Sequence, residues 1–163
     1  EQAQGDVLVP ANYNCPGQIV ITGEAKAVAE AGTALKEAGA RRVLPLKVSG
    51  PFHSPMMRPA GEELAKVFAG VSMNPLKVPY VANINAEVIT DCGKIEELLV
   101  AQVSGSVRWQ QSVETMIREG VDTFVEIGPG KTLTGFLRKI DKNVKSYHIG
   151  SWEEAVLVCE ELK

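Results

Sequence analysis

Cysteine and histidine are scarce in this sequence of 163 residues. The three cysteines, Cys15, Cys92 and Cys159, are odd in number and far apart, which argues against a disulfide framework and against paired metal ligands. This usage is typical of a reducing compartment, so we expect free thiols and a cytoplasmic location. The two histidines, His53 and His148, are also far apart, and neither H-x-x-x-H nor C-x-x-C occurs. The sequence therefore predicts no metal site, and we expect no other cofactor.

Long apolar runs and clusters of basic residues are lacking as well. No stretch approaches the roughly 18 apolar residues that span a bilayer, so we expect no membrane segment. The net charge of −3, without any run rich in lysine or arginine, argues against nucleic-acid binding. The chain begins at Glu1 with neither an initiator methionine nor a signal-peptide pattern, and we expect it to be a piece of a longer polypeptide.

The composition that remains, 45% hydrophobic and 23% charged, is typical of one soluble globular unit. The first zone, residues 6–48, predicts the order β-β-α-β. A helix is expected over about residues 24–38, where apolar residues recur at helical spacing and Gly39 follows. Strands are expected over residues 7–13, 18–23 and 41–48. This order is typical of a split βαβ sandwich that lacks its first strand and helix.

The second zone, residues 49–163, alternates helix and strand. Ser54 and Pro55 predict a helix start, because a hydroxyl can cap free N–H groups and proline suits the first helical position. Ser106 is expected to cap a later helix that ends at Gly120. The other predicted elements are helices over residues 94–103, 131–140 and 153–163, and strands over residues 77–85, 122–128 and 144–150. Such alternation predicts a largely parallel sheet covered on both faces.

The segment VSGPFHSPMM, residues 48–57, places His53 between a strand and a helix. A neutral imidazole can accept a proton, as a general base must. The alternative is a histidine that only packs against the turn or caps it, and spacing alone leaves both open. His148 lies in an apolar strand beside Tyr147, where we expect a structural role.

No nucleophile accompanies this candidate base. The nucleophile elbow G-x-S-x-G does not occur, and Ser54 is better explained as a helix cap. The segment EIGPGKTLTG, residues 126–135, is similar to part of a phosphate loop, but Val125 stands where the first glycine is required. We therefore expect a tight turn there, near an active-site rim, in which Gly128 and Gly130 allow sharp backbone geometry.

Three blocks of the sequence are similar to a known family. ANYNCPGQIVITG, VSGPFHSPMM and FVEIGPGKTLTGFLRKI together resemble the malonyl-CoA:acyl carrier protein transacylases of bacterial fatty-acid synthesis, in order along essentially the whole chain. The resemblance implies an α/β fold with an α/β-hydrolase-like parallel sheet and a ferredoxin-like small subdomain. Residues 1–48 would belong to the small subdomain, and residues 49–163 would be the C-terminal part of the large domain.

The resemblance also implies roles for single residues. His53 matches the base that removes the proton of the catalytic serine. Gln102 matches a residue whose backbone carbonyl orients that histidine, although an exposed polar residue at a helix end is the alternative. Asn12 and Asn14 match a stretch near the substrate arm, where simple turn formation is equally open. Phe52, directly before the histidine, goes with malonyl in related domains, because a bulky ring leaves little room for an α-methyl group.

The reaction implied is malonyl transfer from CoA to the phosphopantetheine thiol of acyl carrier protein through a Ser–His acyl-enzyme. The expected partners are malonyl-CoA, CoA, the carrier protein and an N-terminal portion of the same enzyme. In the family that portion holds the serine elbow, the oxyanion-hole amides and an arginine for the malonyl carboxylate. None of these has a matching position here, so we expect the chain to be inactive alone.

Two other functions stay open at this point. One is a non-catalytic module that binds the carrier protein or CoA, and the other is an acyltransferase domain of a polyketide synthase. A sheet edge that exposes apolar surface would favour part of an enzyme over a self-contained binding module.

Overall fold

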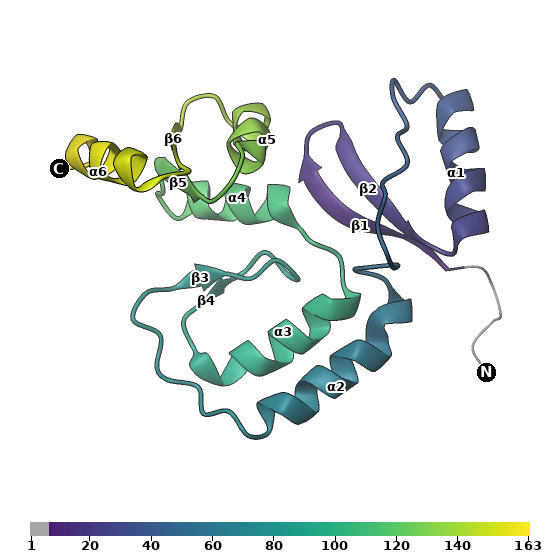
Figure 1. The fold of residues 1–163 in the computed structure, drawn as a ribbon, viewed down its shortest axis with the longest axis horizontal. Helices are drawn as coiled ribbons and strands as arrows, with labels where there is room; N and C mark the ends of the chain where they lie inside the picture. Colours follow the sequence, from purple (N-terminus) through teal and green to yellow (C-terminus); the bar gives the residue numbers. More distant parts are fainter. Residues whose placement is uncertain (1–6) are drawn as a thin grey trace.

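The computed structural model of the protein describes residues 7–163, so the first six residues of the predicted small subdomain lie outside the described part. In Figure 1 an antiparallel hairpin and α1 (Ala25–Glu37) lie at one end of the molecule, and α6 (Trp152–Glu161) lies at the other. Helices and two further short sheets fill the space between them. The α/β class predicted from the sequence is confirmed.

The hairpin consists of β1 (Leu8–Cys15) and β2 (Gln18–Gly23), as predicted. Cys15 pairs with Gln18, so Pro16 and Gly17 form a two-residue loop. Gly17 has φ +77°, the left-handed value that the third position of a type II turn requires, and proline suits the second position. The pairing register shifts twice along β1, so this strand carries irregularities that turn it locally.

The predicted first helix is confirmed as α1, and it ends where the sequence indicates. Gly39 has φ +94° and its N–H bonds the carbonyl of Lys36, while the Ala40 N–H bonds the carbonyl of Leu35. This pair of bonds satisfies carbonyl groups that the last helical turn leaves free, in the arrangement called a Schellman motif.

Residues 41–48 do not form the predicted third strand. Leu44, Leu46 and Val48 expose 58%, 61% and 64% of their surface, and no described strand pairs with them. A strand is stable only when a neighbour accepts and donates its backbone hydrogen bonds, and Pro45 has no N–H to offer. The apolar spacing of the segment is typical of a strand, but the part of the chain that is described supplies no strand beside it.

The helix predicted to start at Ser54 is confirmed, with a short opening turn. Ser54 Oγ accepts a hydrogen bond from the Met56 N–H at 3.3 Å, and the 3₁₀ turn η1 (Pro55–Met57) leads into α2 (Arg58–Phe68). The predicted helix over residues 94–103 is α3 (Ile95–Ser104), which follows the short turn η2 (Cys92–Lys94). The two long helices pack closely at Gly61, where a Cβ would lie 3.2 Å from the Val100 carbonyl oxygen.

The strand predicted over residues 77–85 shrinks to β3 (Tyr80–Val81), which pairs antiparallel with β4 (Val88–Ile89). The chain reverses directly after β3, because the N–H of Ala86 bonds the carbonyl of Ala82 and the N–H of Ala82 bonds the carbonyl of Glu87. Ala86 adopts φ +60° in this turn. The polar residues that follow the apolar run therefore belong to a turn and not to a longer strand.

Ser106 does not cap the next helix, which is a second correction. Helix α4 (Trp109–Arg118) begins three positions later, after Arg108. The Ser106 hydroxyl instead donates to the carbonyl of Pro10 at 2.6 Å. Local spacing suggested a cap, whereas contact with a distant strand decided the conformation of this segment. The predicted end of the helix is confirmed, since Gly120 follows with φ +94°.

The remaining predicted elements are confirmed as β5 (Thr123–Ile127), α5 (Thr132–Ile140), β6 (Lys145–Ile149) and α6. Strands β5 and β6 are parallel, with α5 as their crossover. Among residues 7–163 this is the single parallel pair of strands, since the other two sheets are antiparallel pairs; one isolated parallel bridge joins Asn12 to Val107. The largely parallel sheet that the alternation predicts is not seen in residues 7–163, where the strands form one parallel and two antiparallel pairs.

The core lies where β1 packs against α4 and α5. Val113 of α4 is fully buried, and Ala11, Cys15 and Leu137 are nearly so. The three cysteines are free, as predicted, although Cys15 is buried. None of the helices in the described part of the chain has the length and apolar character needed to cross a bilayer.

The end of β2 offers a test of the hairpin. Gly23 has φ +149°, and a Cβ at this position would overlap the carbonyl oxygen of Val7. We expect Gly23→Ala to lower the free energy of unfolding by about 3 kcal/mol. The matched control is Gly17→Ala, where φ is also positive but nothing lies near the added methyl group, and the expected loss is about 1 kcal/mol. Urea unfolding of both variants measures the difference, and equal losses would contradict the assigned contact.

Candidate active site

His53 occupies an uncommon backbone conformation directly before Ser54, the residue that caps η1. Its φ is +59°, in the left-handed region that few residues other than glycine adopt. Ser54 fixes the turn, because its buried hydroxyl donates to the Pro51 carbonyl at 2.7 Å and accepts from the Met56 N–H. Strained residues of this kind persist only where surrounding contacts hold them, and they occur often at functional sites. Ser54 thus acts as the predicted cap, and its hydroxyl both donates and accepts a hydrogen bond.

Backbone carbonyl groups hold the half-buried imidazole of His53 on one side. Nδ1 lies 3.1 Å from the carbonyl oxygen of Gln102 and 3.2 Å from that of Gly105. Oxygen lone pairs can only accept, so the arrangement is favourable when Nδ1 carries the proton. In the neutral ring Nε2 is then the atom with a free lone pair. The imidazole is therefore arranged to accept a proton at Nε2 while two carbonyl groups hold the N–H at Nδ1.

Gln102 lies in the last turn of α3 and contributes through both backbone and side chain. Its carbonyl accepts from His53, and its side-chain Nε2 donates to the carbonyl oxygen of Gly105 at 2.9 Å. The same amide lies 3.5 Å from the carbonyl oxygen of Ser106. Carbonyl groups at a helix end lack hydrogen-bond partners within the helix. The Gln102 side chain supplies a donor to two carbonyl groups just after α3, those of Gly105 and Ser106.

The segment that follows α3 is also bonded to β1. The Val107 N–H donates to the Ala11 carbonyl at 2.8 Å, and the Tyr13 N–H donates to the Val107 carbonyl at 2.9 Å. Val107 thereby forms a parallel bridge with Asn12. Together with the Ser106–Pro10 hydrogen bond, these contacts place Asn12 beside the loop whose carbonyl groups hold His53.

The other two predicted site residues lie close in sequence to these groups. Phe52 directly precedes His53 and leaves 46% of its surface exposed. Asn14 is half-buried on β1, next to the second register shift of that strand. Among the described residues, the hydrogen bonds bring together His53 and Gln102, and none joins the side chain of Asn12 or Asn14 to the imidazole.

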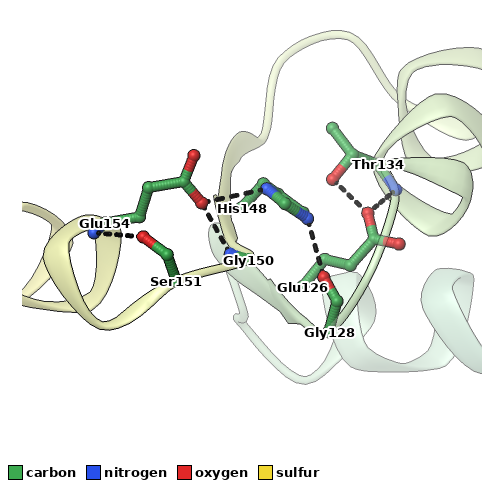
Figure 2. Close-up of polar contacts among 7 residues, drawn as sticks. All are labelled: Glu126, Gly128, Thr134, His148, Gly150, Ser151 and Glu154. Atoms are coloured by element: carbon green, nitrogen blue, oxygen red, sulfur yellow. Dashed lines mark hydrogen bonds and ion pairs between the residues drawn. The ribbon is translucent and has the colours of Figure 1, made fainter.

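The second histidine serves a different part of the molecule. Figure 2 shows His148 between the glycine-rich loop after β5 and the start of α6. Its Nε2 lies 2.9 Å from the carbonyl oxygen of Gly128, and its Nδ1 lies 3.5 Å from a carboxylate oxygen of Glu154. The same carboxylate accepts the Gly150 N–H, and Ser151 Oγ accepts the Glu154 N–H. These contacts fit the structural role expected for His148.

Glu126 fixes the other side of the same loop (Figure 2). Its carboxylate accepts the N–H groups of Leu133 and Thr134 at 3.0 and 2.8 Å, and the Thr134 hydroxyl at 2.6 Å. Burial raises the pKa of Glu126, but the hydrogen bonds from Thr134 and Leu133 outweigh it and hold this pKa below its usual value. The segment is therefore a structural turn that the Glu126 carboxylate anchors to α5. This role explains why the segment is similar to only part of a phosphate loop.

A family model for the acyl transferase domain matches residues 1–156. The chain belongs to this acyltransferase family.

Individual members of the acyltransferase family are closely similar. The malonyl CoA-acyl carrier protein transacylase of Bacillus subtilis (strain 168) is 43% identical over 160 residues, which cover 98% of this chain and 50% of the relative. That of Escherichia coli (strain K12) is 45% identical over 140 residues, which cover 86% and 45%. The chain spans about half the length of these curated relatives. The resemblance stated from the three sequence blocks is confirmed.

Solved structures of the family agree with the fold. The acyl carrier protein S-malonyltransferase of Vibrio cholerae matches with a TM-score of 0.91 at 42% identity, over 96% of this chain and 51% of that chain. A malonyl-transacylase in complex with a type II polyketide synthase acyl-carrier protein (PlMCAT:AntF) matches with a TM-score of 0.93 at 38% identity, over 98% and 52%.

The sequence did not reveal the parts played by Gly105 and Ser106 in this acyltransferase chain. Gly105 contributes only its carbonyl oxygen to His53, and every residue has such a group. Ser106 contacts a strand that lies far from it along the sequence. The one local signal is that a glycine follows α3, which indicates a helix end but no contact with a histidine.

The anchoring role of Glu126 predicts a pH dependence. When the pKa of a carboxylate is lower in the folded state than in the unfolded state, the ionised carboxylate stabilises the fold at pH values above its usual pKa of 4.5. This contribution disappears as the pH falls through the folded-state pKa. We expect Glu126→Gln to lower the urea midpoint at pH 7, and we expect the difference from wild type to shrink below pH 4.5. Urea unfolding at a series of pH values measures it, with exposed Glu62→Gln as the control. A difference that stays constant down to pH 3 would contradict the assignment.

Proposed function

We propose that this chain supplies the general base of a malonyl-CoA:acyl carrier protein S-malonyltransferase. The observation that carries the proposal is the arrangement around His53, whose Nδ1 faces two carbonyl oxygens and leaves Nε2 as the proton acceptor. Membership of the acyltransferase family, and relatives that bear the transacylase name, support the same reaction.

In the proposed reaction a serine hydroxyl attacks the thioester carbonyl of malonyl-CoA while His53 Nε2 takes the hydroxyl proton. The tetrahedral intermediate collapses, the C–S bond breaks, and the imidazolium returns its proton to the CoA thiolate. The phosphopantetheine thiol of the carrier protein then attacks the malonyl ester, again giving its proton to Nε2. Collapse of this second intermediate returns the proton to the serine oxygen and leaves malonyl on the carrier.

No carboxylate is needed behind the imidazole in this scheme. The carbonyl groups of Gln102 and Gly105 hold the Nδ1–H in place, and they accept its hydrogen bond more strongly when the ring becomes positively charged. They thus perform the orienting task that an aspartate performs in a Ser-His-Asp triad.

The serine is the part of the mechanism that these residues do not offer. Ser54, the hydroxyl nearest to His53 in sequence, is buried and has its hydroxyl engaged on both sides. Ser106 donates to Pro10, and no serine has the elbow pattern. We infer that the nucleophile belongs to an N-terminal portion outside residues 1–163, and that this chain alone does not transfer malonyl.

The same portion would complete the fold. In the proposed arrangement residues 1–48 belong to a ferredoxin-like subdomain and residues 49–163 to an α/β-hydrolase-like domain whose sheet includes β5 and β6. Exposed apolar side chains support it, because Ile127 of β5 exposes 77% of its surface and the segment with Leu44, Leu46 and Val48 has no strand beside it in residues 7–163. Such surface favours part of an enzyme over a self-contained binding module.

Carrier protein and CoA are the proposed partners of the assembled enzyme. A malonyl-transacylase of the same fold has been solved in complex with an acyl-carrier protein, which supports a carrier protein as the acceptor. Asn12 lies on β1 beside the loop that holds His53, a position from which an amide could bind the phosphopantetheine or acyl group. Asn14, two positions along the same strand, is proposed for the same task.

Reconstitution tests the base. We expect no malonyl transfer by the chain alone and transfer after a separately produced N-terminal half is added. In the reconstituted enzyme, His53→Ala is expected to reduce kcat/KM by at least about 100-fold, because general-base catalysis contributes that much or more. The control is His148→Ala, corrected for folded protein, since His148 lies outside the site. Turnover by the pure chain, or a His53→Ala variant near the wild-type rate, would contradict the proposal.

Phe52 provides a test of acyl specificity. A bulky ring beside the base leaves little space for an α-methyl group, so Phe52→Ser is expected to raise the ratio of methylmalonyl to malonyl transfer by about tenfold. Phe52→Tyr keeps the bulk of the ring and should leave the ratio near that of wild type. Competition between the two CoA thioesters in the reconstituted enzyme measures the ratio. An unchanged ratio in Phe52→Ser would exclude Phe52 as the residue that sets this preference.

A further inference from the structure

Three polar groups meet at one point of the site. His53 Nδ1 lies 3.1 Å from the Gln102 carbonyl oxygen, 3.2 Å from the Gly105 carbonyl oxygen and 3.4 Å from the side-chain Nε2 of Gln102. The two carbonyl groups are acceptors and the amide nitrogen is a donor, so the three neighbours favour different protonation states of Nδ1. Which of them controls the ring depends on where the amide directs its hydrogens.

The surrounding carbonyl groups determine that direction. The amide Nε2 lies 2.9 Å from the carbonyl oxygen of Gly105, which is closer than its distance to the imidazole. A flipped amide would bring its oxygen against the carbonyl oxygens of Gly105 and Ser106, which is repulsive. Gln102 Oε1 is buried and has no hydrogen-bond partner among the described residues. A buried polar atom without a partner costs free energy, and the amide keeps this orientation and its hydrogen bond to Gly105 in spite of that cost.

From this geometry we propose that the side chain of Gln102 is a positioning residue for the general base, separate from its backbone carbonyl. Its amide holds the Gly105 carbonyl as the second acceptor of the His53 Nδ1–H, and thereby keeps the ring in the Nδ1–H form with Nε2 free. The catalytic part of this inference rests on the function proposed above, whereas the structural part concerns the ring of His53 alone.

Contacts with other elements also hold the loop of Gly105 in place. On its far side Ser106 and Val107 are bonded to β1, which fixes the loop relative to that strand. Gly105 also sits in a tight position against Ile84, where a Cβ would overlap Ile84 Cδ1 and lie 3.0 Å from the Ala101 carbonyl oxygen. The amide of Gln102 is the side-chain donor that joins the loop to the helix end carrying the first acceptor. Its removal would delete the side-chain hydrogen bond that fixes the direction of the Gly105 carbonyl, while the first acceptor stays.

Ring-nitrogen NMR of the ¹⁵N-labelled chain tests the structural part without any activity. At a pH where the rings are neutral, we expect the Nδ1–H form of His53 to predominate in wild type. Gln102→Met keeps the length of the side chain and its backbone carbonyl but deletes the amide. We expect it to shift the ratio of Nδ1–H to Nε2–H forms by about fivefold toward Nε2–H, since one hydrogen bond of ordinary strength is lost. Gln102→Leu gives a second apolar replacement if the first folds poorly.

The matched control is Gln110→Met, because the Gln110 side chain bonds Glu114 within α4 and no group of the site. A predominant Nε2–H form in wild type would overturn the inference, and so would an unchanged ratio in folded Gln102→Met or Gln102→Leu.

A second measurement separates this inference from the proposed function. In enzyme reconstituted with the N-terminal half, Gln102→Met is expected to lower kcat about tenfold and to leave the KM for malonyl-CoA within about twofold of wild type, because misplacing the base affects the chemical step. If wild type gives no transfer while the NMR shift is observed, the proposed function fails and the positioning of the ring stands. If transfer occurs and kcat is unchanged in both Gln102 variants, the positioning role fails.

Discussion

The hydrogen bonds of the short segment from Gly105 to Val107 connect the two regions that form the candidate site. On one side the carbonyl oxygen of Gly105 lies against Nδ1 of His53, and on the other side Val107 pairs with β1. The segment can make both sets of contacts because it is extended between α3 and α4, with its backbone groups free of helical bonds. If it were helical, β1 and the turn of His53 would lose their link.

The site depends on backbone carbonyl groups where many hydrolases use a carboxylate. Carbonyl oxygens bring no charge into a half-buried place, so they orient the imidazole without the desolvation cost of an ion. They do require that the chain itself is fixed, because a carbonyl cannot be moved independently of the backbone. Three contacts fix the backbone around the site. Ser54 caps the helix start, the Gln102 amide donates to the Gly105 carbonyl after α3, and Ser106 is bonded to β1.

Much of the local structure could be read from the sequence, for physical reasons that particular elements illustrate. Gly39 and Gly120 end their helices because only glycine adopts positive φ without cost, and Ser54–Pro55 opens one because both residues suit the first turn. Such signals act over a few residues. The segment over residues 41–48 has the spacing of a strand and yet forms none in the described chain, because strand pairing needs a neighbour that local spacing cannot supply. Ser106 has the chemistry of a cap but bonds Pro10 instead.

The sequence by itself determined the α/β class, most element boundaries, the family and the candidate base, since these depend on short patterns and on similarity along the chain. It also favoured Ser54 as a helix cap over a nucleophile, because a serine before proline suits a helix start. Only the tertiary structure decided which atoms hold the imidazole and which nitrogen is left to accept a proton. The reason is that the decisive contacts are made by backbone carbonyl groups, which every residue has, and they join positions that lie about 50 residues apart in sequence.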